Sequence, residues 1–167
     1  MFNPPTRVSS LAAMAFAALA ALSAVVPAHA AGKLDLQFIA PEKYSDIGHG
    51  GYDRDRNLKS LADYLQTLVA QLPDGQTLTL EVLDIDLAGE LRPGAAQEIR
   101  VLRGGADWPH MSLRYTLAQN GTTLKSGFER LSDMAYLDHP RRSESYGDLA
   151  YDKRMLQDWF RKTFTAP

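Results

Sequence analysis

The chain contains no cysteine. This absence excludes disulfide bonds, a thiol nucleophile, and the acylated cysteine by which a lipoprotein is anchored. If the chain is exported to an oxidising compartment, its fold therefore depends on packing and hydrogen bonding alone.

Histidine is scarce, and the familiar catalytic motifs are missing. The chain has four histidines, and His49, His110 and His139 lie too far apart in the sequence for the spacing of a zinc site. No Gly-x-Ser-x-Gly elbow, phosphate-binding loop or dinucleotide fingerprint is present. We therefore predict no catalytic set, no metal and no cofactor, and the sequence favours a protein that is not an enzyme.

A strong charge of either sign is also missing. Arg7 is the only charged residue of the first 30, so the remainder carries 17 Lys and Arg against 20 Asp and Glu, a net charge of −3 with neutral histidines. This balance gives no electrostatic footprint for nucleic acid or for an anionic membrane surface.

Residues 1–30 have the pattern of a secretory signal. Arg7 gives a positive start, residues 11–26 are apolar, and Ala28-His29-Ala30 is a small-x-small cleavage site. We expect cleavage before Ala31, a soluble periplasmic protein without membrane insertion, and one domain over residues 31–167.

The first half of that domain predicts strand, helix and strand. Residues 33–39 alternate apolar and polar side chains, and residues 58–72 carry an aliphatic stripe at helical spacing. We expect a polar loop over 42–56, a cap at Asp55 or Asn57, and a helix end at Pro73. Residues 77–89 form the central strand, parallel to the first.

After residue 89 we expect a loop, and residues 97–102 form at most a short strand. A hairpin follows. Asn120-Gly121 is typical of a type I′ turn, and the flanking residues alternate. The predicted register places three pairs on the face of the sheet that we expect the helices to cover: Leu117–Leu124, Tyr115–Ser126 and Leu113–Phe128. It places Thr116–Lys125 and Ser112–Glu129 on the face exposed to solvent. Arg130 then lies on the covered face, opposite Met111.

A last helix is predicted from a cap at Asp148, with an apolar stripe containing Leu156, Trp159 and Phe160 beside charged Asp152, Lys153 and Asp158. The order is β-α-β-(β)-β-β-α. The predicted fold is α+β, with two layers: a mixed four- or five-stranded sheet and two helices on one of its faces.

The central strand contains an inconsistency at Asp84 and Asp86. Both share the parity of apolar Leu80 and Val82. Either a bulge near Val82–Asp84 turns them to solvent, or they are buried and need partners. In the second case the candidate partners are Arg100, Arg103, Arg114 and Arg130, and we predict that one of these arginines holds at least one of the aspartates.

Four residues in loops are candidates for contacts with a partner: His49, Tyr52, Trp108 and His139. The favoured function is a non-catalytic envelope module that binds an envelope protein or component. The alternative is a small hydrolase or metal-dependent enzyme that uses Asp84 and Asp86 together with His49 or His139.

Four stretches, residues 41–46, 84–89, 131–137 and 151–160, resemble the exported proteobacterial family known as domain of unknown function 3016. The first matches its Pro-Glu-x-Tyr-x-Asp start. The resemblance implies an envelope location and a fixed place in the fold for the aspartate motif. It implies no activity, because none is assigned to the family.

Overall fold

The computed structural model describes residues 31–94, 98–138 and 148–165. In chain order the elements are β1 (Lys33–Phe38), the 3₁₀ turn η1 (Pro41–Lys43), α1 (Gly50–Val69), β2 (Gln76–Asp86), β3 (Glu90–Arg92), β4 (Ile99–Val101), β5 (His110–Gln119), β6 (Thr122–Ser132), α3 (Ala150–Phe160) and the π-helical turn η2 (Arg161–Thr165). The predicted signal segment and His139 lie outside the described residues.

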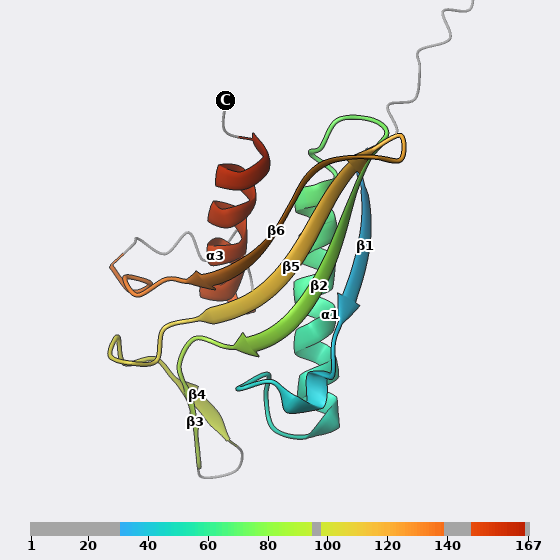
Figure 1. Cartoon of the computed structure of the whole chain (residues 1–167). Helices are drawn as coiled ribbons and strands as arrows, with labels where there is room; N and C mark the ends of the chain where they lie inside the picture. The colour runs from blue at the N-terminus through green and yellow to red at the C-terminus, as the bar shows by residue number, and fades with distance from the viewer. Residues whose placement is uncertain (1–30, 95–97, 139–147, 166–167) are drawn as a thin grey trace, which may run out of the picture.

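A mixed four-stranded sheet forms one layer, in the order β1-β2-β5-β6 (Figure 1). β1 and β2 are parallel, as the predicted crossover requires, and β2-β5 and β5-β6 are antiparallel. The short strands β3 and β4 form a separate two-stranded sheet. The optional strand of the sequence prediction therefore exists, but it does not join the main sheet.

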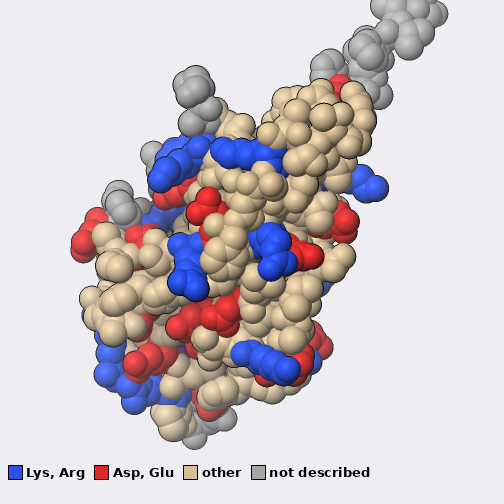
Figure 2. Space-filling model, viewed as in Figure 1, with Lys and Arg blue, Asp and Glu red and all other residues tan. Residues whose placement is uncertain are grey.

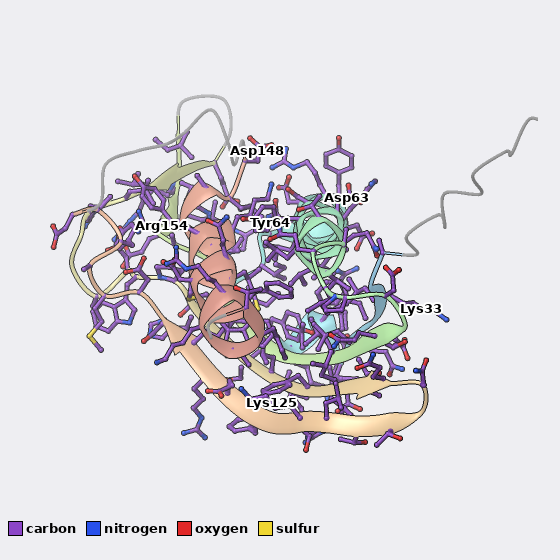
Figure 3. All side chains as sticks on the ribbon, turned by 90° about the horizontal axis from the view of Figure 1, so that it is seen from above. Lys33, Asp63, Tyr64, Lys125, Asp148 and Arg154 are labelled. Atoms are coloured by element: carbon purple, nitrogen blue, oxygen red, sulfur yellow. The ribbon has the colours of Figure 1, made fainter. Side chains whose placement is uncertain are left out.

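Both helices cover the same face of the main sheet, as the view from above shows (Figure 3). The core between the layers takes aliphatic side chains from α1 and β2, and from α3 it takes Leu156, Trp159 and Phe160. The predicted two-layer α+β fold is confirmed. The opposite face of the sheet is not covered by α1 or α3.

A bulge in β2 resolves the parity of the central strand. Val82 pairs with Leu113 and Asp84 with Ser112, so Leu83 is an extra residue. This insertion places Val82 and Ile85 in the core, where each is 1% exposed, and turns Asp84 and Asp86 towards the uncovered face with Ser112 and His110. Of the two alternatives in the sequence, the bulge is the correct one.

The predicted hairpin turn is present, but the predicted register is wrong. Asn120 and Gly121 have positive φ, and Gln119 pairs with Thr122. A bulge then places Gly127, rather than Ser126, opposite Tyr115. A Cβ on Gly127 would lie 2.9 Å from the Tyr115 ring, so a serine would not fit there without movement.

Because the register is shifted by one residue, the β6 side chains that were predicted to face the helices are exposed to solvent instead. Leu124 and Phe128, predicted to be buried, are 51% and 50% exposed, and Phe128 pairs with Arg114 instead of Leu113. Arg130 pairs with Ser112 on the uncovered face rather than opposite Met111, and Leu131 takes the position beside Met111.

Helix α1 starts earlier than predicted, within the expected polar loop. Its N-cap is His49, without a side-chain hydrogen bond, so neither Asp55 nor Asn57 caps it. Asn57 instead lies buried in the second turn and donates to the carbonyl of Ile47 over 2.9 Å. This tertiary bond ties the preceding loop to the helix and outweighs the low helix propensity of Gly50 and Gly51.

Helix α3 is buried on more sides than its stripe predicts. Its N-cap is Leu149 rather than Asp148, and Asp152 and Lys153, predicted to face solvent, are 3% and 8% exposed. The reason is that α3 packs against α1 as well as against the sheet. The Lys153 ammonium lies 5.9 Å from the centre of the Tyr64 ring on α1, and burial lowers the pKa of Lys153.

Candidate functional site

The two aspartates lie at the end of β2 on the uncovered face. Asp84 accepts two hydrogen bonds from Ser45, from the backbone N–H to Oδ1 over 2.8 Å and from the hydroxyl to Oδ2 over 2.9 Å. Both carboxylate oxygens of Asp84 therefore contribute to fastening the loop after β1 to β2.

Asp86 is more open. Its nearest basic group is His110, with 3.8 Å between Oδ2 and Nδ1, and the two side chains are 45% and 41% exposed. That separation is too long for a hydrogen bond. Burial raises the pKa of Asp86, the neighbouring carboxylates of Asp46 and Asp84 act in the same direction, and His110 and Arg100 oppose them.

An arginine does clamp a carboxylate here, but the carboxylate belongs to Asp46. Arg100 donates to both oxygens of Asp46 over 2.7 and 3.0 Å, and to the carbonyl of Gly89 over 2.8 Å. The prediction that Asp84 or Asp86 is held by an arginine is therefore wrong. The sequence offered Asp46 only as part of a polar loop, which concealed that this loop lies beside β2 and bridges to Asp86.

The other candidate arginines are spread over the molecule. Arg114 pairs with Glu81 on the uncovered face. The Arg130 guanidinium lies 5.5 Å from the centre of the Phe128 ring. The side chain of Arg103 is exposed. The structure therefore does not bring the predicted polar cluster together as one site.

Sequence reasoning missed two buried acids beside this region. Asp152 accepts the N–H of Ala88 over 3.1 Å, and burial raises its pKa to about 7. Burial also acts to raise the pKa of Asp107, but hydrogen bonds from the N–H groups of Arg103 and Gly105 and from Tyr136 lower it overall. Both acids accept backbone N–H groups from loops around the β3–β4 sheet, which is a structural role.

The predicted contact residues are not neighbours either. His49 binds Glu98 over 2.8 Å, whereas Tyr52 projects from the first turn of α1 and is 80% exposed. The Trp108 ring is centred 5.4 Å from that of His110, and its Nε1 has no hydrogen-bond partner in the described part of the chain.

Within residues 31–94, 98–138 and 148–165, no group of three or more His, Asp or Glu side chains has an arrangement that could hold a metal ion. Asp84, Asp86 and His110 thus share an end of the sheet without forming a ligand set. Over the same ranges, no helix is long and apolar enough to cross a membrane.

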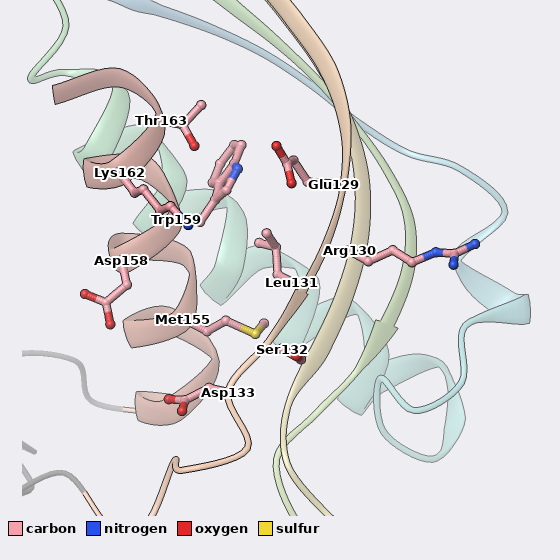
Figure 4. A pocket seen from close by; sticks show the side chains of 10 residues that line it. All are labelled: Glu129, Arg130, Leu131, Ser132, Asp133, Met155, Asp158, Trp159, Lys162 and Thr163. Atoms are coloured by element: carbon pink, nitrogen blue, oxygen red, sulfur yellow. The ribbon is translucent and has the colours of Figure 1, made fainter. Parts of the chain in front are cut away.

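A groove of about 380 Å³ lies between β6 and α3 and is called the β6–α3 groove below. Figure 4 shows Met155 and Trp159 reaching from α3 towards β6, and Glu129 and Leu131 pointing back at them from the strand. Arg130 points to the other face. The groove was not predicted, because it depends on the corrected hairpin register.

Comparisons with known proteins give one specific result. No protein with a curated description matches the chain. A candidate lipoprotein from Caulobacter crescentus CB15 aligns at 18% identity over 77% of this chain and 82% of that chain, with a TM-score of 0.32. A minor lipoprotein from Acinetobacter baumannii aligns at 14% identity over 78% and 87%, with a TM-score of 0.23. Likeness this weak carries no argument.

The match to a family model is of a different kind, since it spans residues 32–162 and includes all four stretches that carried the sequence resemblance. The chain therefore belongs to the family described as protein of unknown function, DUF3016.

Proposed function

We propose that this protein is an exported, non-catalytic module of the cell envelope that binds another envelope protein along strand β6. The proposal of export rests on the signal pattern of residues 1–30. The binding proposal rests on the face of the sheet that the helices leave uncovered.

One observation carries the binding proposal. Phe128 is 50% exposed on the uncovered face, with the Arg130 guanidinium over its ring at 5.5 Å. Leu124 on the same strand is 51% exposed. Aromatic and arginine side chains dominate the energy of protein interfaces, and a half-exposed ring beside a guanidinium is a ready anchor for a partner.

The charges around this anchor suit a protein partner rather than a polyanion. Acidic and basic side chains are interspersed on the viewed face instead of forming a field of one sign (Figure 2). Arg114, the cross-strand neighbour of Phe128, is already paired with Glu81. Specific contact with a mixed, partly apolar surface is the interaction that such a face supports.

The enzyme alternative receives less support from the geometry. It needs Asp84 and Asp86 to act together, but Asp84 is engaged by Ser45 through both oxygens. For Asp86, the nearest basic group in the described ranges is His110, which lies beyond hydrogen-bond distance. A general acid–base pair needs both groups free to reach a substrate.

The test is site-specific photo-crosslinking in living cells, with the photoreactive residue at Ser126 on the exposed side of β6. Gln66, exposed on α1 across the molecule, is the matched control position. We expect a discrete adduct from position 126 that is absent from position 66, and that is lost when Phe128→Ser and Arg130→Ala are combined. Equal adducts from both positions, or none from 126, would contradict the proposal. Fractionation of the same cells, with N-terminal sequencing, tests export and cleavage before Ala31.

A further inference from the structure

Strand β6 is an open edge of the sheet. It pairs with β5 on one side, and no other strand among the described residues pairs with it. Most of its residues are exposed. An edge strand of this kind presents unpaired N–H and C=O groups that can accept another strand.

The β6–α3 groove runs beside this edge and is closed by a side-chain bond at each end. At one end, Lys125 Nζ donates to the carbonyl of Thr163 over 2.9 Å. At the other, Arg154 donates to Asp133 over 2.6 Å. Between these bonds, the space beside the strand is about 380 Å³.

The groove contains a buried donor without an acceptor. Trp159 is only 7% exposed, and its ring is fixed by edge contacts with Tyr115 and Phe164 at 5.8 and 5.4 Å. Its Nε1–H has no hydrogen-bond partner among the residues that the structure describes. Buried indole N–H groups are normally paired, because an unmade bond leaves the full cost of desolvation.

An acceptor without a donor faces it. Glu129 points into the groove beside the indole (Figure 4), and no hydrogen bond or ion pair joins its carboxylate to another residue that the structure describes. A group that satisfies both must accept one hydrogen bond and donate another. The primary amide of Asn or Gln does this with a neutral side chain.

We propose that the groove receives an extended segment of the partner protein, which pairs with β6 as an additional strand and directs an Asn or Gln side chain between Trp159 and Glu129. Main-chain pairing with an edge strand supplies affinity, and a pocket for alternate side chains supplies specificity. This inference rests on the proposed function, since it names the chemistry of the partner that the module binds.

The test uses a displayed library of random twelve-residue peptides, selected on the wild-type domain. Trp159→Phe removes the N–H and keeps the ring, and Trp108→Phe removes the other unpartnered indole N–H, outside the groove. We expect the selected peptides to be enriched in Asn or Gln at one position. Trp159→Phe should weaken their binding about fivefold, whereas Trp108→Phe should have no effect.

N-methylation of alternate peptide bonds should abolish binding if the peptide pairs with β6, because it removes main-chain donors. Amide resonances of wild-type residues 127–132 should shift on binding, while those of β1, the other edge, should not. This second measurement does not depend on any variant folding. Binding that survives N-methylation, or shifts confined to β1, would overturn the inference.

Two further outcomes are decisive. If sedimentation shows that the protein alone dimerises through β6, the occupant is a second copy and the inference fails. If no peptide is enriched while the adduct from Ser126 persists in cells, the partner class is wrong but the binding function stands. Loss of both would remove the proposed function as well.

Discussion

At one edge of the sheet β1 runs beneath α1, and at the other β6 runs beside α3, and the chain that follows each strand is bonded to a different extent. Beyond Phe38 the chain stays bonded to β2: Ile39 N–H donates to the carbonyl of Val82, and Asp46 N–H donates to that of Ile85, each over 2.9 Å. Beyond Ser132 the chain also stays bonded to the neighbouring strand's segment, but through one bond, from the N–H of Asp133 to the carbonyl of Pro109 over 3.3 Å.

The hollows beside β1 and β6 differ in whether they contain a buried polar atom without a partner. The hollow between β1 and α1 has about 550 Å³ and is lined by Leu34, Asp35, Leu36, Phe38, Ala62, Asp63 and Gln66. None of these carries a buried polar atom without a partner, whereas Trp159 in the β6–α3 groove does. Both outer strands thus lack a second strand partner in the described ranges, and what separates the two sides is the buried donor on the β6 side, whose hydrogen bond remains to be made.

The largest expected effect comes from truncating the side chain that distinguishes the two grooves. Trp159→Ala should lower the free energy of unfolding by about 3 to 5 kcal/mol, because it removes a buried ring and leaves a cavity. Phe38→Ala, on the β1 side and only partly buried, should cost about 1 to 2 kcal/mol. Urea denaturation of both variants measures this. A cost below about 1 kcal/mol for Trp159→Ala would show that α3 is not fixed by this ring.

The second prediction uses pH to separate the helices. α3 is tied to Ala88 by the buried carboxyl of Asp152, whereas α1 is tied to Ile47 by the neutral amide of Asn57. Burial raises the pKa of Asp152 to about 7 in the folded protein, and the unfolded chain titrates near 4. Between these values the folded protein binds more protons, so stability falls as the pH rises from about 4 to about 7.

Asp152→Asn removes this dependence and keeps an oxygen for the N–H of Ala88. We expect the variant to match the wild type near pH 4 and to exceed it by roughly 2 to 4 kcal/mol at pH 8. Asp63→Asn, an exposed change on α1, is the control and should leave the profile unchanged in shape. Parallel profiles for wild type and Asp152→Asn would show that the carboxyl is not buried.

Local patterns predicted the elements of this fold well. Alternation identified β1, β5 and β6, helical spacing identified the core side of both helices, and Asn120-Gly121 identified the turn. These signals depend on neighbours in the sequence, so they need no knowledge of tertiary contacts. The parallel pairing of β1 and β2 followed from the order strand, helix, strand and from the short connection after α1.

The failures all arise where a tertiary contact overrides the local signal. A bulge beside Leu117 shifts the register of β6, and the Tyr115 ring leaves room for Gly127 opposite it. α1 and the loop of Ala88 bury one charged flank of α3. Asp46 takes the arginine expected for the strand aspartates, because the loop after η1 lies against β2. Which side chains of β6 and α3 are exposed, and which carboxylate pairs with Arg100, can therefore be predicted only when these tertiary contacts are known.

The smallest expected effect concerns the β1 side of the sheet. If Asp84 only ties the loop after β1 to β2, divalent cations should find no ligand set there, since Ser45 already engages both of its oxygens. Calcium, magnesium or zinc added to the chelator-treated protein should leave the melting temperature unchanged, and Asp84→Asn should cost only about 1 kcal/mol, because one acceptor oxygen remains. A saturable rise in melting temperature that Asp84→Asn and Asp86→Asn abolish would make this edge a metal site. It would then favour the metal-dependent enzyme, and the β1 side rather than the β6–α3 groove would be the candidate binding site.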